Sequence, residues 1–137
     1  MSKMFRSTIK QDPAAQARVE AWIAALRSGE YVQIRGSLRS PLFREAGAYG
    51  YCCLGVRCEI ENPKGWRQAG YDYDGDFDSA ELPSQLALRD HLETSDGRFL
   101  ENDLISKTLI ELNDDEEHWS FGQIAEVIEA ELKLALA

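Results

Sequence analysis

The strongest structural signal in the chain is a helix start close to its C-terminal end. Ser120 followed by Gln123 predicts a capping box, and Trp119 with Ile124 predicts a hydrophobic staple. Apolar residues then recur at helical spacing along one stripe: Ile124, Ile128, Leu132 and Leu136. The acidic residues of the segment fall on or near the other side: Glu126, Glu129 and Glu131. This pattern predicts a C-terminal helix with one face in the core.

Weaker signals predict more helices upstream. Asp12-Pro13 suits a helix start, Trp22 lies on the apolar face that follows, and Gly29 marks the end. Three further helices are predicted over residues 53–61, 82–92 and about 102–112.

Two short stretches favour β-structure. Residues 31–35 are typical of a strand that is broken at Gly36-Ser37, and residues 48–51 are predicted to return antiparallel to it. Asp74-Gly75 suits a tight hairpin turn between Tyr73 and Asp76.

Together the elements predict an α+β fold, with four to five helices and one or two short antiparallel β-hairpins. The length of 137 residues suits one hydrophobic core. We therefore expect a single domain over residues 12–137, after a flexible N-terminal tail of residues 1–11.

Charge is distributed very unevenly along the chain. Residues 1–67 carry 11 basic and 6 acidic groups (+5), whereas residues 68–137 carry 4 basic and 18 acidic groups (−14), which sum to the net charge of −9. Such a field steers anions to one side and cationic protein surfaces to the other, so it indicates binding more than chemistry. The acidic half argues against binding of extended duplex nucleic acid.

The N-terminal segment has no apolar run long enough for a secretory signal or a membrane span. A cytoplasmic protein with reduced thiols is therefore expected, because its only cysteines, Cys52, Cys53 and Cys58, lie within seven residues. Cys52 and Cys53 lie at a predicted helix start, and the helix dipole lowers the pKa of a thiol at that position. A cysteine nucleophile therefore stays open as an alternative. Burial in the core is the favoured interpretation, and neither a metal nor a cofactor is predicted.

The favoured ligand site combines arginines, tyrosines and a glycine. Guanidinium groups bind phosphate, glycine lets backbone amides approach it, and tyrosine rings stack on bases. The predicted ligand-binding residues are Tyr31, Arg35, Gly36, Ser37, Arg39, Tyr51 and Arg57. The competing interpretation is an ordinary exposed strand edge on which arginines discourage aggregation.

Two acidic runs are candidates for contact with a basic partner. The run from Asp72 to Asp78 resembles a calcium loop, but Phe77 and Pro83 stand where the EF-hand requires glycine and glutamate. The predicted partner-binding residues are Asp72, Asp74, Asp76, Asp114 and Asp115. Their alternative role is that of an ordinary solvated surface.

Several motifs together resemble a widespread family of small, uncharacterised proteins encoded by tailed bacteriophages. The matching residues are Trp22, Tyr31, Gln33, Gly36, Leu38, Cys52 to Val56, Cys58, Leu82-Pro83, Leu112 to Asp114 and Ser120-Phe121. Two departures are Arg57, at a place that is usually apolar, and an insertion from Asp115 to His118. The resemblance implies a phage protein in the host-cell cytoplasm and transfers no reaction.

These observations favour a phage accessory protein, of host-takeover or anti-defence type, that sequesters or inhibits a host protein or a nucleotide signal without catalysis. Two alternatives stay open. One is a small cysteine-dependent enzyme acting on a phosphate-containing ligand, and the other is a structural module that forms a homo-oligomer through its last helix.

Overall fold

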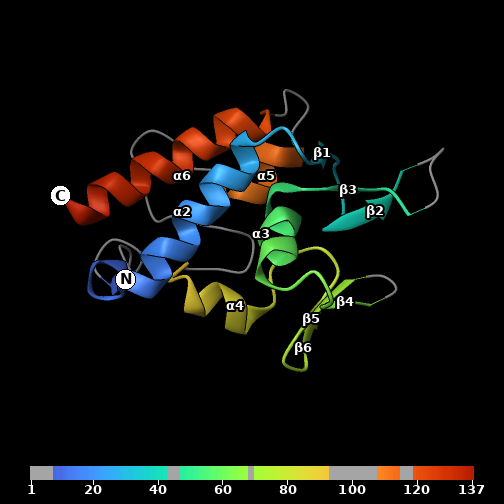
Figure 1. The fold of residues 1–137 in the computed structure, drawn as a ribbon, viewed down its shortest axis with the longest axis horizontal. Helices are drawn as coiled ribbons and strands as arrows, with labels where there is room; N and C mark the ends of the chain where they lie inside the picture. Colours follow the sequence, from blue (N-terminus) through green and yellow to red (C-terminus); the bar gives the residue numbers. More distant parts are fainter. Residues whose placement is uncertain (1–7, 43–46, 68–69, 93–107, 115–118) are drawn as a thin grey trace.

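The computed structural model describes residues 8–42, 47–67, 70–92, 108–114 and 119–137 (Figure 1). The helical elements are the 3-10 turn η1 (Ile9–Gln11) and the α-helices α2 (Pro13–Arg27), α3 (Cys53–Glu61), α4 (Ser84–Arg89), α5 (Leu109–Asp114) and α6 (Phe121–Leu136). The strands are β1 (Val32–Gln33), β2 (Arg39–Pro41), β3 (Tyr49–Tyr51), β4 (Trp66–Arg67), β5 (Gly70–Tyr73) and β6 (Asp76–Asp78). The predicted small α+β fold is confirmed, and the described residues form five α-helices and two three-stranded sheets.

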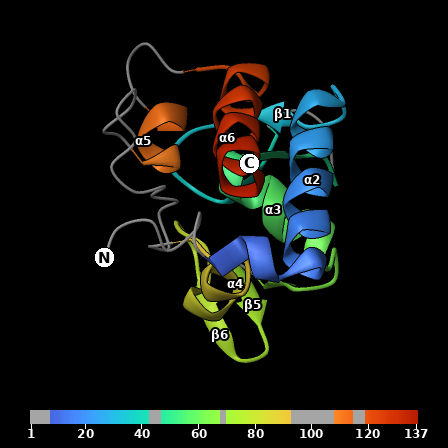
Figure 2. The same cartoon turned by 90° about the vertical axis from the view of Figure 1, so that its left-hand side faces the viewer.

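Helices α2 and α6 lie side by side, and α3 packs against α2 (Figures 1 and 2). Asp12 caps α2 by accepting a hydrogen bond from the Ala15 amide at 3.1 Å, and the predicted capping box of α6 is present. Trp22 is fully buried, and its indole Nε1 donates to the Cys53 carbonyl at 3.0 Å. This bond joins α2 to the start of α3.

The first sheet differs from the prediction. Strand β3 pairs antiparallel with β2 and parallel with β1, so the strand order is β1-β3-β2. The predicted antiparallel pairing of residues 31–35 with 48–51 is therefore wrong. The hairpin instead joins β2 to β3, and the chain between β1 and β2 turns through Gly36, whose φ is +86°.

The second sheet contains the predicted hairpin. Strands β5 and β6 pair antiparallel, and Asp74 and Gly75 have φ values of 50° and 90° in the turn between them. Two positive φ values are what a type I′ hairpin turn requires. Strand β4, which was not predicted, adds a third strand beside β5.

The amide side chain of Asn113 connects α5, β1 and α3. Asn113 is fully buried. Its Oδ1 accepts hydrogen bonds from Gln33 Nε2 at 2.9 Å and from the Cys53 amide at 3.2 Å. Its Nδ2 donates to the Ile34 carbonyl at 2.7 Å and to the Asp114 carboxylate at 2.9 Å. One side chain thus satisfies polar groups from three separate elements.

Some predicted boundaries and faces need correction. Helix α4 ends at Arg89 rather than near residue 92, because His91 has a φ of 65°. Glu131 was expected near solvent but is 2% exposed, since α6 is covered by both α2 and α5.

Two predicted segments fall partly outside the described residues. Of the helix predicted over 102–112, residues 102–107 lie outside that part of the chain, and α5 begins at Leu109. Of the predicted N-terminal tail, residues 9–11 form η1, which buries Ile9. Among the described helices, none combines the length and the hydrophobicity that crossing a bilayer requires.

Replacing Asn113 by alanine should lower the free energy of unfolding by about 2–4 kcal/mol, because buried polar groups at Cys53 and Ile34 lose their partner. Urea denaturation measures this loss. The matched control is Asn62→Ala at the exposed end of α3, which should cost no more than about 1 kcal/mol. Equal losses from the two variants would contradict the central role of Asn113.

Glycine-to-alanine substitutions should have opposite effects at two helical positions. A Cβ on Gly55 would lie 1.8 Å from the Leu38 carbonyl oxygen, whereas the nearest atom to a Cβ on Gly122 would be the Ser120 hydroxyl oxygen, at 3.8 Å. We expect Gly55→Ala to destabilise by about 3 kcal/mol or more and Gly122→Ala to be neutral or to stabilise by up to about 1 kcal/mol. Thermal or urea unfolding tests both, and a neutral Gly55→Ala would show that the contact between α3 and the chain before β2 relaxes easily.

Candidate functional site

The structure divides the predicted ligand residues into three places. Tyr31, Arg39 and Tyr51 come together on the first sheet. Gly36 faces Asp114 at a different point, and Arg57 is in the protein interior.

Arg39 lies against an aromatic cluster. Its guanidinium carbon is 3.7 Å from the centre of the Tyr49 ring and 4.5 Å from the centre of the Trp66 ring. Tyr51 is the cross-strand neighbour of Arg39, and its ring centre is 5.5 Å from that of Tyr31 and 6.0 Å from that of Trp66. We call these five residues the Arg39 surface. Cation–π contacts of this kind hold a guanidinium group in a defined orientation.

Glu59 supports the cluster from α3. Its carboxylate accepts a hydrogen bond from the Trp66 indole at 2.8 Å. Burial, together with the negative charge of Glu59, raises the pKa values of Tyr31 and Tyr51, so both phenols stay neutral well above pH 7.

The guanidinium of Arg39 keeps its hydrogen-bonding capacity. It is partly exposed, and its contacts within the described residues are with the two rings rather than with a hydrogen-bond acceptor or a carboxylate. Its N–H groups can therefore donate hydrogen bonds to a carboxylate or a phosphate of another molecule.

Gly36, by contrast, already binds an anion of the chain itself. Its amide donates to both carboxylate oxygens of Asp114 at 3.3 Å. The Gly36 amide, which the sequence suggested as a phosphate contact, is thus bound to the Asp114 carboxylate. Arg35 is exposed and Ser37 is partly exposed on the same connection.

Arg57 is 1% exposed and belongs to a buried ionic network. Its Nη2 donates to Asp90 at 3.0 Å and to Glu61 at 3.0 Å. Asp90 also accepts from Arg18 Nε at 3.2 Å, and Glu61 from Arg89 at 2.6 Å. Burial alone would lower the pKa of Arg57, but the neighbouring carboxylates outweigh it and raise the pKa. Arg57 therefore neutralises buried carboxylates and is separate from the Arg39 surface.

Most of the predicted partner-binding acids stabilise local structure. Asp72 accepts the Gly75 amide at 2.7 Å within the hairpin turn. Asp76 accepts the Gln85 amide at 2.8 Å and so satisfies a backbone donor in the first turn of α4. Asp74 is exposed at the tip of the hairpin, and Asp115 lies outside the described residues.

The three thiols are buried and free. Cys52 caps α3, where its sulfur accepts the Gly55 amide at 3.4 Å, yet burial raises its pKa to about 11. Burial also raises the pKa values of Cys53 and Cys58 well above the usual thiol value. Desolvation therefore outweighs the helix-start effect that the sequence suggested. Within the described part of the chain, no three side chains of His, Cys, Asp or Glu are placed to hold a metal ion.

Sequence reasoning left Trp66 and Glu59 out of the site. Tyr49 accompanies Tyr31 and Tyr51 among the tyrosines of the candidate stretch, but it is not one of the predicted ligand-binding residues. The alternation of Tyr49, Gly50 and Tyr51 on one strand was the available signal, since alternate residues share a face. No local pattern linked this strand to Trp66.

Native thiols should alkylate slowly. With a pKa of about 11, Cys52 is a thiolate in only about one molecule in a thousand at pH 8, and its burial limits access further. We expect iodoacetamide labelling of the native protein at least about tenfold slower than labelling of the urea-unfolded chain, followed by mass spectrometry. Labelling of Cys52 at the rate of an exposed free cysteine would contradict its buried, protonated state.

Comparison with curated proteins and with solved structures found no match for the chain. The family described as "Domain of unknown function (DUF8296)" matches residues 15–132. This range includes Trp22, the Cys52 to Cys58 segment, Asn113 and Ser120-Phe121, which also carry the motif resemblance. Because the match covers most of its length, the chain belongs to the DUF8296 family.

Proposed function

We propose that this chain is a phage-encoded accessory protein that binds and inhibits an acidic host protein through the Arg39 surface, without catalysis. The observation that carries the proposal is the arginine oriented by two aromatic rings with its N–H groups turned to no acceptor in the described residues. The phage assignment rests on the motif resemblance alone.

The composition of the Arg39 surface supports a protein partner. Arginine, tyrosine and tryptophan are the residue types that most often dominate the binding energy of protein interfaces. The rings supply apolar area, and the guanidinium supplies donors in a fixed plane that match a carboxylate in a two-point contact. The surface also belongs to the half of the chain with an excess of basic residues, which favours an acidic partner.

A phosphate would satisfy the same guanidinium, so a nucleotide signal is the second source of the required anion. The cysteine-dependent enzyme has less support. The three thiols are buried, and Cys52 is protonated near neutral pH. Arg57, which was predicted to bind the phosphate, is buried in the protein interior.

Native mass spectrometry of the purified protein, before and after incubation with host lysate, tests the proposal. Arg39→Ala should weaken capture of a stoichiometric protein by at least about tenfold. Arg39→Lys should recover only part of it, because lysine keeps the charge but not the planar donors. The matched control is Lys10→Ala, which removes a cation from the exposed side of η1 and should leave capture unchanged.

The outcomes separate the two sources of the anion. An added protein mass supports a host protein, whereas an added mass below about 1 kDa that Arg39→Ala abolishes would move the proposal to a nucleotide. No added mass at low salt, or equal capture by Arg39→Ala and Lys10→Ala, would overturn binding through this surface.

A further inference from the structure

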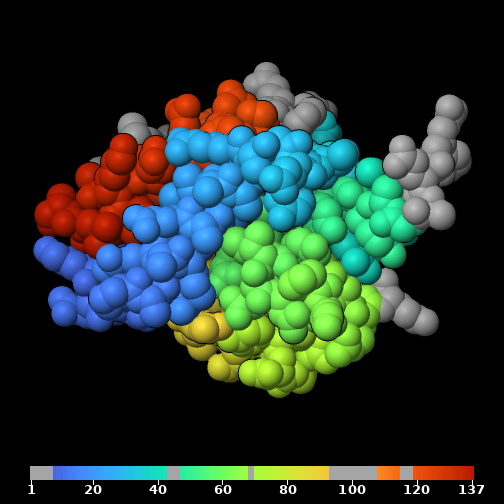
Figure 3. All heavy atoms as spheres, in the orientation of Figure 1, coloured from blue at the N-terminus to red at the C-terminus, as the bar shows by residue number. Residues whose placement is uncertain are grey.

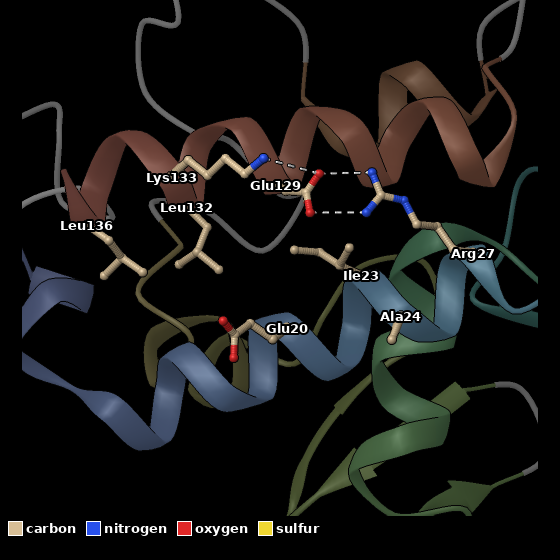
Figure 4. Close-up of a pocket in the computed structure, with 8 residues that line it drawn as sticks. All are labelled: Glu20, Ile23, Ala24, Arg27, Glu129, Leu132, Lys133 and Leu136. Atoms are coloured by element: carbon tan, nitrogen blue, oxygen red, sulfur yellow. Dashed lines mark hydrogen bonds and ion pairs between the residues drawn. The ribbon is translucent and has the colours of Figure 1, made fainter.

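A groove of about 480 Å³ separates part of α2 from part of α6 (Figure 4). Its apolar lining comes from Ile23 and Ala24 on α2 and from Leu132 and Leu136 on α6. Leu136, the last residue of α6, is 38% exposed. The groove lies on different elements from the Arg39 surface.

The rim of this groove carries equal numbers of acidic and basic groups: Glu20, Arg27, Glu129 and Lys133. Arg27 donates to both carboxylate oxygens of Glu129 at 3.1 Å, and Lys133 Nζ is 3.9 Å from the same carboxylate. Glu20 has no ion pair with a described residue. Glu20 and Lys133 stand on opposite walls of the groove (Figure 4).

The outward surface of α2 continues the groove as a smooth apolar strip. Exposed alanines recur along it at spacings of three and four residues: Ala14, Ala17, Ala21 and Ala24. Ala24 belongs to both the strip and the groove. Side chains this small allow a second helix to approach closely, so the strip extends the area that an occupant of the groove could bury.

We propose that the occupant of this groove is a second copy of the same chain, docked about a two-fold axis. Leu136 of each copy would enter the groove of the other, and Glu20 of each copy would face the second copy's Lys133. A two-fold contact requires a self-complementary surface, and opposite charges on the two walls of one groove provide it.

The balanced rim also bears on the choice of partner. A rim with zero net charge gives little electrostatic attraction to a strongly charged partner of either sign. Two copies that each carry −9 repel one another overall, and a contact over balanced charges adds no local repulsion to this. This proposal is independent of the Arg39 surface, and either can fail without the other.

Sedimentation velocity from about 5 to about 500 µM tests the proposal, and it should show a reversible monomer–dimer equilibrium. Raising the salt from about 0.02 to about 0.5 M should strengthen the dimer, because salt screens the repulsion between two acidic copies. Ala24→Arg, on an exposed position that leaves the core intact, should raise the dissociation constant at least about tenfold.

Charge exchange identifies the contact. Glu20→Lys and Lys133→Glu should each weaken the dimer about fivefold or more, and the double variant should restore it. The matched control is Glu126→Lys, on an exposed position of α6 that does not line the groove, which should not weaken the dimer. Circular dichroism verifies that every variant is folded. A monomer at all concentrations, a dimer insensitive to Ala24→Arg, or failure of the double variant to restore the dimer would each overturn the proposal.

Discussion

The fold depends on one buried amide. Asn113 accepts from a strand side chain and from the first amide of α3, and it donates to the carbonyl that follows β1. Without it, the two-residue strand β1 would keep its short parallel pairing with β3 and the hydrogen bond from Gln33 Nε2 to the Trp119 carbonyl, which together are little for a stable strand. Asp114, the residue after Asn113, accepts a hydrogen bond from the Gly36 amide and so holds the chain just after β1 against the end of α5 as well. The positions of β3 and of the Arg39 surface beside it follow from this anchor.

Burial changes the chemistry of the residues that looked most reactive. The thiols at the start of α3 are protonated because desolvation outweighs the local helix-start effect. Arg57 stays charged in the interior because Asp90 and Glu61 compensate its charge there. The arginine is thus matched by carboxylates from α3 and from the residue after α4, and the network extends to Arg18 on α2. Burial thus keeps the thiols protonated, whereas buried carboxylate partners keep the guanidinium charged.

The molecule has two surfaces with different physical character. The Arg39 surface, on the first sheet, combines aromatic area with guanidinium donors that have no acceptor among the described residues, which suits an anionic partner. The α2–α6 groove is apolar with a balanced rim, which suits a second copy of the chain. Figures 1 and 3 place β2 and the C-terminal end of α6 towards opposite ends of the molecule, so one surface can be occupied without covering the other.

The sequence by itself determined the features that short-range hydrogen bonds control. The capping box of α6, the Asp12 cap of α2 and the Asp74-Gly75 turn depend on neighbours within three residues of one another. Tertiary structure decided what depends on distant residues. The parallel pairing of β1 with β3 needed Asn113, which is 80 positions from Gln33. Likewise, Arg39 meets Trp66 only because the second sheet lies beside the first. The physical reason is that caps and turns satisfy their own polar groups, whereas strand pairing, burial of charge and the composition of a surface depend on which distant residues exclude water from them.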